Sequence, residues 1–178
     1  MKKLLLTASS LLLITHLALA DRPFQAALTP DIAIVPRGET VRGLSLNIWG
    51  ENQVNGVSLG FVNGHVGESS GFSWSYIGTY AEDYRGVIWG GFFAHTTGEV
   101  VGWQQGMVNI SRGSLTGLQS GLVNWGEEVK GVQLGLVNYT KNLHGVQVGL
   151  ANVATNNAWF TDLPRDLAPG FPFVNWSF

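Results

Sequence analysis

Three nearly identical blocks of eight residues are the most informative part of this sequence: Gly117-Leu-Gln-Ser-Gly-Leu-Val-Asn124, Gly131-Val-Gln-Leu-Gly-Leu-Val-Asn138 and Gly145-Val-Gln-Val-Gly-Leu-Ala-Asn152. Their leading glycines are 14 residues apart. Degraded copies come before them, at spacings of 13 to 16 residues, with leading glycines Gly43, Gly56, Gly71, Gly86 and Gly102. Evenly spaced self-similarity is typical of repeat architectures, so we interpret residues 41–154 as eight copies of one structural unit.

Within a copy, large apolar residues alternate with small or polar ones, as in Val132-Gln-Leu134-Gly-Leu136. Successive side chains of a strand point to opposite faces, so this period of two predicts β-strands with one apolar face. Glycine recurs at the fifth position of most copies, which predicts close packing on the other face. Turn-forming residues such as Lys141-Asn142 separate the copies.

The predicted fold class is all-β, an antiparallel meander of about ten strands that closes as a small β-barrel. Eight strands come from the repeats, one from residues 28–36 and one from residues 171–178, with a polar excursion at 155–170. Closure would place the first strand beside the last and leave no exposed edge.

A β-solenoid is the alternative, in which each copy forms one coil and equivalent Asn and Gln residues stack. The apolar positions of a copy span roughly 13 Å at about 3.3 Å per residue. The lipid-facing band of a membrane barrel is about 25 Å tall. Gln105 and Ser120 also interrupt the apolar face, and both observations count against the barrel.

The first twenty residues have the three parts of a bacterial secretory signal peptide. They begin with Met1-Lys2-Lys3, continue with an apolar run and end on Ala18-Leu19-Ala20. The run is shorter than the roughly 20 residues of a membrane-spanning helix. We therefore predict a signal peptide at 1–20, cleaved before Asp21, and a single β-repeat domain at 21–178. The barrel predicts an outer-membrane or cell-surface location, and the solenoid a periplasmic or secreted one.

Composition excludes several classes of protein. Charged residues make up only 12% and aromatic residues 11% of the chain, which is unlike an intrinsically disordered protein. The sequence has no cysteine, which excludes disulfides and thiolate-bound metals. A formal charge of −2 argues against a nucleic-acid partner, since such proteins carry a basic stripe.

The chain offers few groups for catalysis or metal binding. The three histidines after the predicted signal peptide share no short ligand spacing; they are His65, His95 and His144. Two pairs of carboxylates are adjacent in the sequence, Glu82-Asp83 and Glu127-Glu128. Adjacent side chains of a strand point to opposite faces, so neither pair converges as a catalytic pair would. The candidate nucleophiles lack a nearby histidine or elbow motif and are Ser111, Ser114 and Ser120. We predict a non-enzymatic protein with no catalytic, cofactor or metal site.

The Gly-x-Gln-x-Gly-x-x-Asn copies resemble those of the bacterial surface-repeat-containing proteins, a loosely defined group with no established activity. The segments 28–36 and 173–178 also resemble the ends of that group, so the resemblance covers nearly all of the chain after residue 20. A terminal Phe178 after alternating aromatics is similar to the last strand of bacterial outer-membrane barrels. The resemblance implies an envelope location, with outer-membrane lipid as the expected partner, and no specific chemistry.

Two series of amide side chains are the candidate site residues: Gln104, Gln119, Gln133 and Gln147, and Asn109, Asn124, Asn138 and Asn152. They form either structural hydrogen-bonding ladders and turn caps, or a polar stripe that contacts a glycan or another surface ligand. Four tryptophans recur in the copies: Trp74, Trp89, Trp103 and Trp125. They form either a membrane-interface belt, part of a packed core or a platform for carbohydrate. The predicted function is a structural or envelope role at the outer membrane, and the alternative is a secreted binding or adhesion module.

Overall fold

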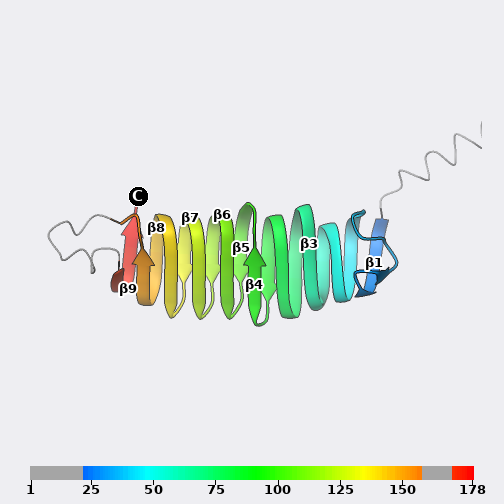
Figure 1. Ribbon diagram of the computed structural model, residues 1–178, viewed down its shortest axis with the longest axis horizontal. Coiled ribbons are helices and arrows are strands. Elements are labelled where there is room, and N and C mark those ends of the chain that lie inside the picture. Colours follow the sequence, from blue (N-terminus) through cyan, green and yellow to red (C-terminus); the bar gives the residue numbers. More distant parts are fainter. Residues whose placement is uncertain (1–21, 158–169) are drawn as a thin grey trace, which may run out of the picture.

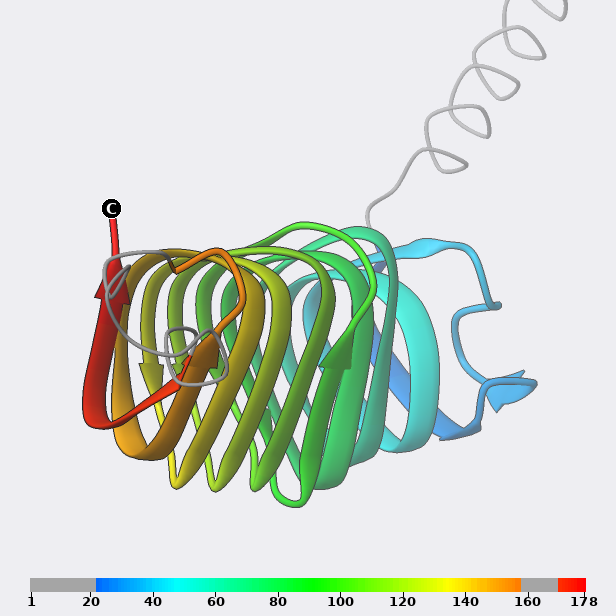
Figure 2. The same cartoon turned by 60° about the vertical axis from the view of Figure 1, so that its left-hand side comes forward.

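The chain winds into a β-solenoid, a stack of flattened coils in which each repeat makes about one turn (Figure 1, Figure 2). The structure is a computed structural model that describes residues 22–157 and 170–178. The regular elements of these residues are all strands. The predicted signal peptide at 1–20 and most of the predicted excursion at 155–170 lie outside the described residues.

Nine strands form one continuous sheet that runs the length of the stack. They are β1 (Arg22–Thr29), β2 (Ile32–Ala33), β3 (Thr40–Gly90), β4 (Phe93–Thr96), β5 (Val100–Gln105), β6 (Val108–Ser120), β7 (Val123–Leu134), β8 (Val137–Ala154) and β9 (Gly170–Ser177). β3 has 51 residues because the strand continues through the bends of the first coils. The strand breaks at or just after the central glycine in the fourth to seventh copies, for example at Gly106 between β5 and β6, whereas β8 continues through Gly149 of the eighth copy.

Neighbouring coils pair in parallel and in register. Gly117, Gln119 and Asn109 of one coil lie beside Gly131, Gln133 and Asn124 of the next. The same pairing continues from β7 to β8. The predicted antiparallel barrel is therefore wrong, and the β-solenoid alternative is confirmed.

The physical reason lies in the buried amides, which need a hydrogen-bonding partner. Parallel stacking in register puts each buried glutamine beside another glutamine, whereas an antiparallel meander would place unlike residues opposite each other. The alternation of apolar and polar residues is the same in both arrangements and does not distinguish them. β1 and β9 lie at opposite ends of the stack (Figure 1). The predicted pairing of segment 28–36 with segment 171–178 is therefore also wrong.

The leading glycines form a column along the stack. Gly117 and Gly131 have φ angles of 133° and 138°, a region that residues with a side chain rarely adopt. A Cβ atom on Gly131 would overlap the carbonyl group of Gly117 in the preceding coil. The central glycines are also closely packed, as predicted, because a Cβ atom on Gly121 would overlap the carbonyl oxygen of Gly106.

A ladder of glutamines runs through the interior of the later coils. Each Nε2 donates to the Oε1 of the preceding coil: Gln147 to Gln133 at 2.7 Å, Gln133 to Gln119 at 2.6 Å, and Gln119 to Gln104 at 2.9 Å. The second N–H of each amide reaches a backbone carbonyl, such as that of Val153 for Gln147. The four side chains are completely buried, and their amide donors are satisfied.

A ladder of asparagines lies across the interior and runs in the opposite direction. Each Nδ2 donates to the Oδ1 of the following coil: Asn109 to Asn124 at 2.8 Å, Asn124 to Asn138 at 2.7 Å, and Asn138 to Asn152 at 2.7 Å. The ladder begins at Asn109 because Ala94 holds the equivalent place in the preceding coil. The Oδ1 atom of Asn109 accordingly has no hydrogen-bond partner.

An apolar column completes the interior at the position two residues before each leading glycine. In the later coils this column comprises the fully buried Val100, Leu115, Val129 and Leu143, and Ala154 after the last copy completes the cluster. In the earlier coils it contains Val41, Val54 and Tyr84. The interior is therefore part hydrocarbon and part hydrogen-bonded amide.

The two ends of the stack are closed differently. At the N-terminal end, β1 pairs in parallel with β3 and in antiparallel with the short β2, so the predicted strand at 28–36 is only partly strand. Gln25 lies in the interior there, and its Nε2 donates to the carbonyl of Val35 at 3.0 Å. At the C-terminal end, β9 pairs with β8 in antiparallel. Asn175 of β9 extends the glutamine ladder by donating to Gln147 at 3.1 Å.

The glycine column is testable by substitution. Gly131→Ala adds both an unfavourable φ angle and a clash with Gly117, so we expect it to lower the free energy of unfolding by about 2–4 kcal/mol. Gly38→Ala is the matched control, because Gly38 has a φ of 88° but open space around its Cβ position. Gly38→Ala should lower the free energy of unfolding by only about 1–2 kcal/mol. Equal losses in urea unfolding would show that the column is not tightly packed.

The glutamine ladder predicts an effect of position. Gln133→Leu should lower the free energy of unfolding by about 2–4 kcal/mol, because Gln119 loses a donor and Gln147 an acceptor. Gln104→Leu should cost about 1–2 kcal/mol, since only Gln119 loses a ladder partner. Ile88 already holds the equivalent place in the preceding coil. Urea unfolding that ranked the two variants in the other order would contradict the ladder.

Candidate functional site

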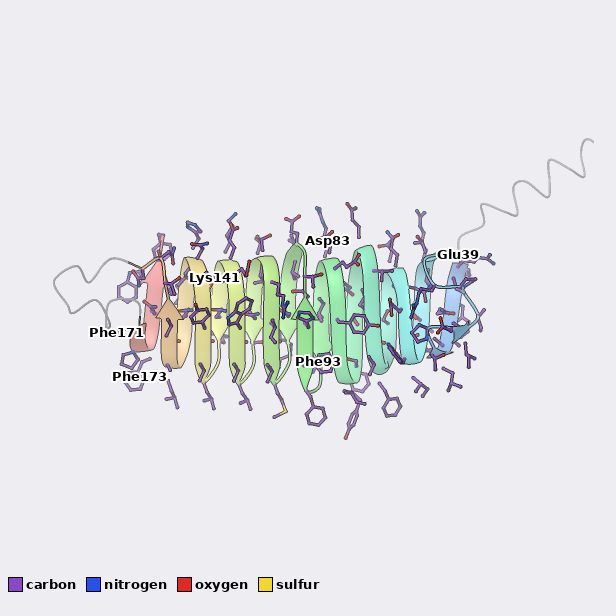
Figure 3. All side chains as sticks on the ribbon, in the orientation of Figure 1. Glu39, Asp83, Phe93, Lys141, Phe171 and Phe173 are labelled. Atoms are coloured by element: carbon purple, nitrogen blue, oxygen red, sulfur yellow. The ribbon has the colours of Figure 1, made fainter. Side chains whose placement is uncertain are left out.

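The charged residues of the coils are confined to one edge of the solenoid. The eight positions that start at each leading glycine contain no charged residue in any copy, for example residues 117–124 and 131–138. The charges occupy the remaining positions and form what we call the charged edge, which comprises Arg42, Glu51, Glu68, Glu82, Asp83, Arg85, Glu99, Arg112, Glu127, Glu128, Lys130 and Lys141. In Figure 3 the labelled Asp83 and Lys141 lie toward the upper edge of the stack.

The bend at the opposite edge carries a row of large apolar side chains, which we call the apolar ridge. Its members are 44% to 63% exposed and are Ile48, Phe61, Tyr76, Phe92, Met107, Leu122, Leu136 and Leu150. The aromatic members pack edge to face, with ring centroids 5.9 Å apart for Phe61 and Tyr76 and 6.4 Å apart for Tyr76 and Phe92. This row was not predicted from the sequence, although an apolar residue usually follows the central glycine.

Exposed apolar side chains continue from the ridge onto both faces of the solenoid. The first face precedes the ridge in each coil and presents Leu46, Leu59, Trp74, Trp89, Leu134 and Val148. The second face follows the ridge and presents Trp49, Ile77, Val108, Val123 and Val137. The apolar surface therefore wraps around one edge of the molecule, and the charged edge lies opposite.

The polar residues within the first face are bonded to one another. The Nε1 of Trp103 donates to the Oγ of Ser120 at 2.7 Å, and that hydroxyl donates to the Oε1 of Gln105. Gln105 and Ser120 interrupt the apolar pattern in sequence, as predicted, but they do so as a hydrogen-bonded group.

Two hollows open on the outside of the solenoid, the larger within the apolar surface and the smaller where the second face meets the charged edge. The larger has a volume of about 910 Å³ and lies between the N-terminal hairpin and the first coils, where Ile32, Ile34, Leu59, Phe61 and Trp74 are among its lining residues. The smaller has a volume of about 520 Å³ and is lined by Val108, Ile110, Arg112, Val123, Trp125 and Glu127. Trp125 also stacks on Tyr139 of the next coil, with the ring planes at 10°. The larger hollow extends the apolar surface toward the N-terminal end.

The structure places the candidate amides in the interior. The four glutamines are fully buried, and so are the four asparagines to within 1%. They form the two ladders, which was the structural alternative in the sequence analysis, and no external ligand reaches them while the coils are stacked. The four tryptophans of the set lie instead on the outer surface: Trp74 and Trp89 are exposed, and Trp103 and Trp125 are half-buried.

The structure does not bring together groups suited to catalysis or metal binding within the described ranges. No cluster of three potential metal ligands occurs among residues 22–157 and 170–178. Glu127 and Glu128 form separate ion pairs, with Lys141 at 2.6 Å and Lys130 at 2.8 Å. The hydrogen bond from Lys130 lowers the pKa of Glu128. Ser111 is buried, and its hydroxyl has no hydrogen-bond partner.

Comparison of the chain with protein-family models, with curated proteins and with solved structures finds no match. No helix among the described residues is long and apolar enough to cross a membrane.

His65 is the one histidine of the described residues that lies fully in the interior. Its Nε2 lies 2.9 Å from the Oγ of Ser73, and its Nδ1 has no partner. Its ring also packs against Tyr84, with centroids 5.0 Å apart. Burial penalises the charged form and lowers the pKa of His65 to about 3.

This burial predicts loss of stability in acid. The pKa of His65 is about 3 in the folded chain and near 6.5 in the unfolded chain, so the unfolded state takes up more protons between these values. The contribution of neutral His65 to the free energy of unfolding is complete above about pH 6.5. It falls as the pH drops and is about 2 kcal/mol smaller at pH 5. Urea unfolding of His65→Gln at pH 7.5 and 5 should show a smaller pH dependence than the wild type. The exposed His144→Gln is the control, and equal pH dependence in all three proteins would contradict the prediction.

Proposed function

We propose that the protein is a non-enzymatic, exported β-solenoid binding module whose binding surface is the apolar ridge with its two flanking faces. The observation that carries the proposal is the complete absence of charge from eight consecutive positions of all eight copies. Contiguous exposed apolar patches of more than a few hundred Å² mark interaction sites in soluble proteins. Side chains such as Phe92, Leu136 and Leu150 are about half exposed or more.

The distribution of residues between interior and surface supports this proposal. The interior holds the amides of the two ladders and one column of buried apolar residues such as Leu115 and Leu143, whereas the phenylalanine, tryptophan and leucine side chains of the ridge and its two faces project outward. The exposed part of an apolar side chain does not stabilise an isolated chain, because that area remains in water. An apolar partner that covers these side chains would remove them from water, and their burial would then stabilise the complex.

Export is part of the proposal because of the sequence features at residues 1–20, which have the layout of a secretory signal peptide. The coils carry both acidic and basic groups along one edge only. That arrangement suits a module that works in the cell envelope or outside the cell, with the charged edge in water and the apolar ridge in contact with its partner.

The proposal is tested with micelles of a nonionic detergent as a general apolar partner. In temperature-induced phase separation, the wild type should enter the detergent-rich phase. A triple variant of the ridge, Leu122→Ser, Leu136→Ser and Leu150→Ser, should move largely to the aqueous phase. The matched control changes three exposed residues at the opposite edge, Thr116→Ser, Asn142→Ser and His144→Ser. A wild type that stays monomeric and aqueous would contradict the proposed function.

A further inference from the structure

We infer that the partner of this surface is a lipid leaflet, into which the apolar ridge inserts as a wedge while the charged edge remains in water. The inference rests on the proposed binding function and names the chemistry of the partner. It requires neither a spanning helix nor a closed barrel, because only one edge of the solenoid enters the lipid.

The shape of the apolar surface favours a fluid partner. Exposed apolar residues cover the tip of the ridge at Leu136, the first face at Leu134 and the second face at Val137. A second copy of the chain, or a flat protein partner, docked on one face would leave the other face in water. Acyl chains surround a wedge on all sides and adapt to a row of unequal side chains.

The depth of the surface matches one leaflet. From Val132 to Leu136 the chain advances four residues, about 13 Å at roughly 3.3 Å per residue. The hydrocarbon core of a bilayer is about 30 Å thick, so one leaflet contributes about 15 Å. The apolar stretch that is too short for a spanning barrel strand therefore fits a wedge that enters halfway.

Hydrogen bonding along the ridge is compatible with a hydrocarbon environment, where each unsatisfied backbone group would be costly. The amide of Leu122 donates to the carbonyl of Met107 at 2.9 Å, and the amide of Leu136 donates to the carbonyl of Leu122 at 2.9 Å. The polar group formed by Trp103, Ser120 and Gln105 is likewise bonded internally. The central coils can thus enter lipid without breaking hydrogen bonds.

Amphipathic aromatic residues mark the boundary between the apolar surface and the charged edge. The Nε1 of Trp49 donates to the hydroxyl of Tyr80 at 3.0 Å, and that hydroxyl donates to Glu51 at 2.9 Å. Tryptophan and tyrosine are enriched where a membrane meets water, because one end of each ring is apolar and the other polar. The polar end of this cluster, the Tyr80 hydroxyl with Glu51, would lie at the level of the lipid headgroups.

From β6 to β8 the ridge residues follow one line, because coils stacked in register place equivalent residues beside each other. These coils can therefore meet a membrane surface together. The C-terminal end continues the ridge, since Phe171 and Phe173 lie on the lower side of the stack in Figure 3, away from Glu39 and Asp83. The exposed Ile32 and the larger hollow continue it at the N-terminal end.

Vesicle flotation tests the inference, with neutral phosphatidylcholine vesicles as the probe. The ridge variant carries Leu122→Glu, Leu136→Glu and Leu150→Glu. The matched control places the same three charges on the opposite edge, as Thr116→Glu, Asn142→Glu and His144→Glu. All three proteins carry the same N-terminus, so any lipid affinity of that segment is shared. The wild type and the control should float, and the ridge variant should bind at least tenfold less. Raising the salt to 1 M should leave flotation unchanged.

Failure of the inference can be distinguished from failure of the proposed function. A wild type that does not float, or a ridge variant that floats equally well, overturns the lipid inference. If such a wild type enters detergent micelles or forms ridge-dependent dimers, the binding function stands with another partner. Circular dichroism establishes that each variant is folded, and the single variant Leu136→Glu replaces any triple variant that is not. Quenching of tryptophan fluorescence by brominated lipid should occur in the wild type and fall in the ridge variant.

Discussion

The structure depends on one constraint, which is that each coil must present its neighbour with a surface that matches itself. Hydrogen-bonded strands lie about 4.8 Å apart, so every inward side chain sits directly against its equivalent in the next coil. An amide satisfies this requirement well, because it carries both a donor and an acceptor. The amide of Gln133 donates to Gln119 and accepts a hydrogen bond from Gln147. Glycine satisfies the same requirement where two backbones touch, as at Gly117 and Gly131.

The consequence is an inversion of the usual distribution of residues. With amides and glycines committed to the interior, most large apolar residues of the eight-residue block lie outside, where alternation along the strand places them, and the buried Leu115 and Leu143 belong to the column that precedes the block. The earlier coils satisfy the constraint less regularly. Ser73 and His65 pair with each other rather than with their equivalents, and Ser58 has no side-chain partner. The regular ladders begin only after Ile88 and Ala94, which occupy the ladder positions of the fourth coil.

Much of the fold can be predicted from the sequence, because repeat spacing and a period of two are local properties. The strands, the coil boundaries and the close packing of Gly121 follow from them. The direction of pairing does not, since Val132-Gln-Leu134 reads the same in a parallel coil and in an antiparallel hairpin. The ladder of Gln104 and its equivalents was foreseen only as one of two alternatives. The ridge at Met107 and Leu122 escaped prediction because its exposure depends on where the coil bends.

The opposite directions of the two ladders bear on how such a chain can change in length over evolution. A row of amides that all point one way has a dipole that grows with every added coil. Here the glutamine donors face the N-terminal end and the asparagine donors face the C-terminal end, so the two dipoles largely cancel. A duplicated unit of 14 residues, such as 131–144, would add one hydrogen bond to each ladder and almost no net dipole. Gain or loss of a whole coil is therefore close to neutral in electrostatic energy, and the number of coils is free to vary between descendants of one gene.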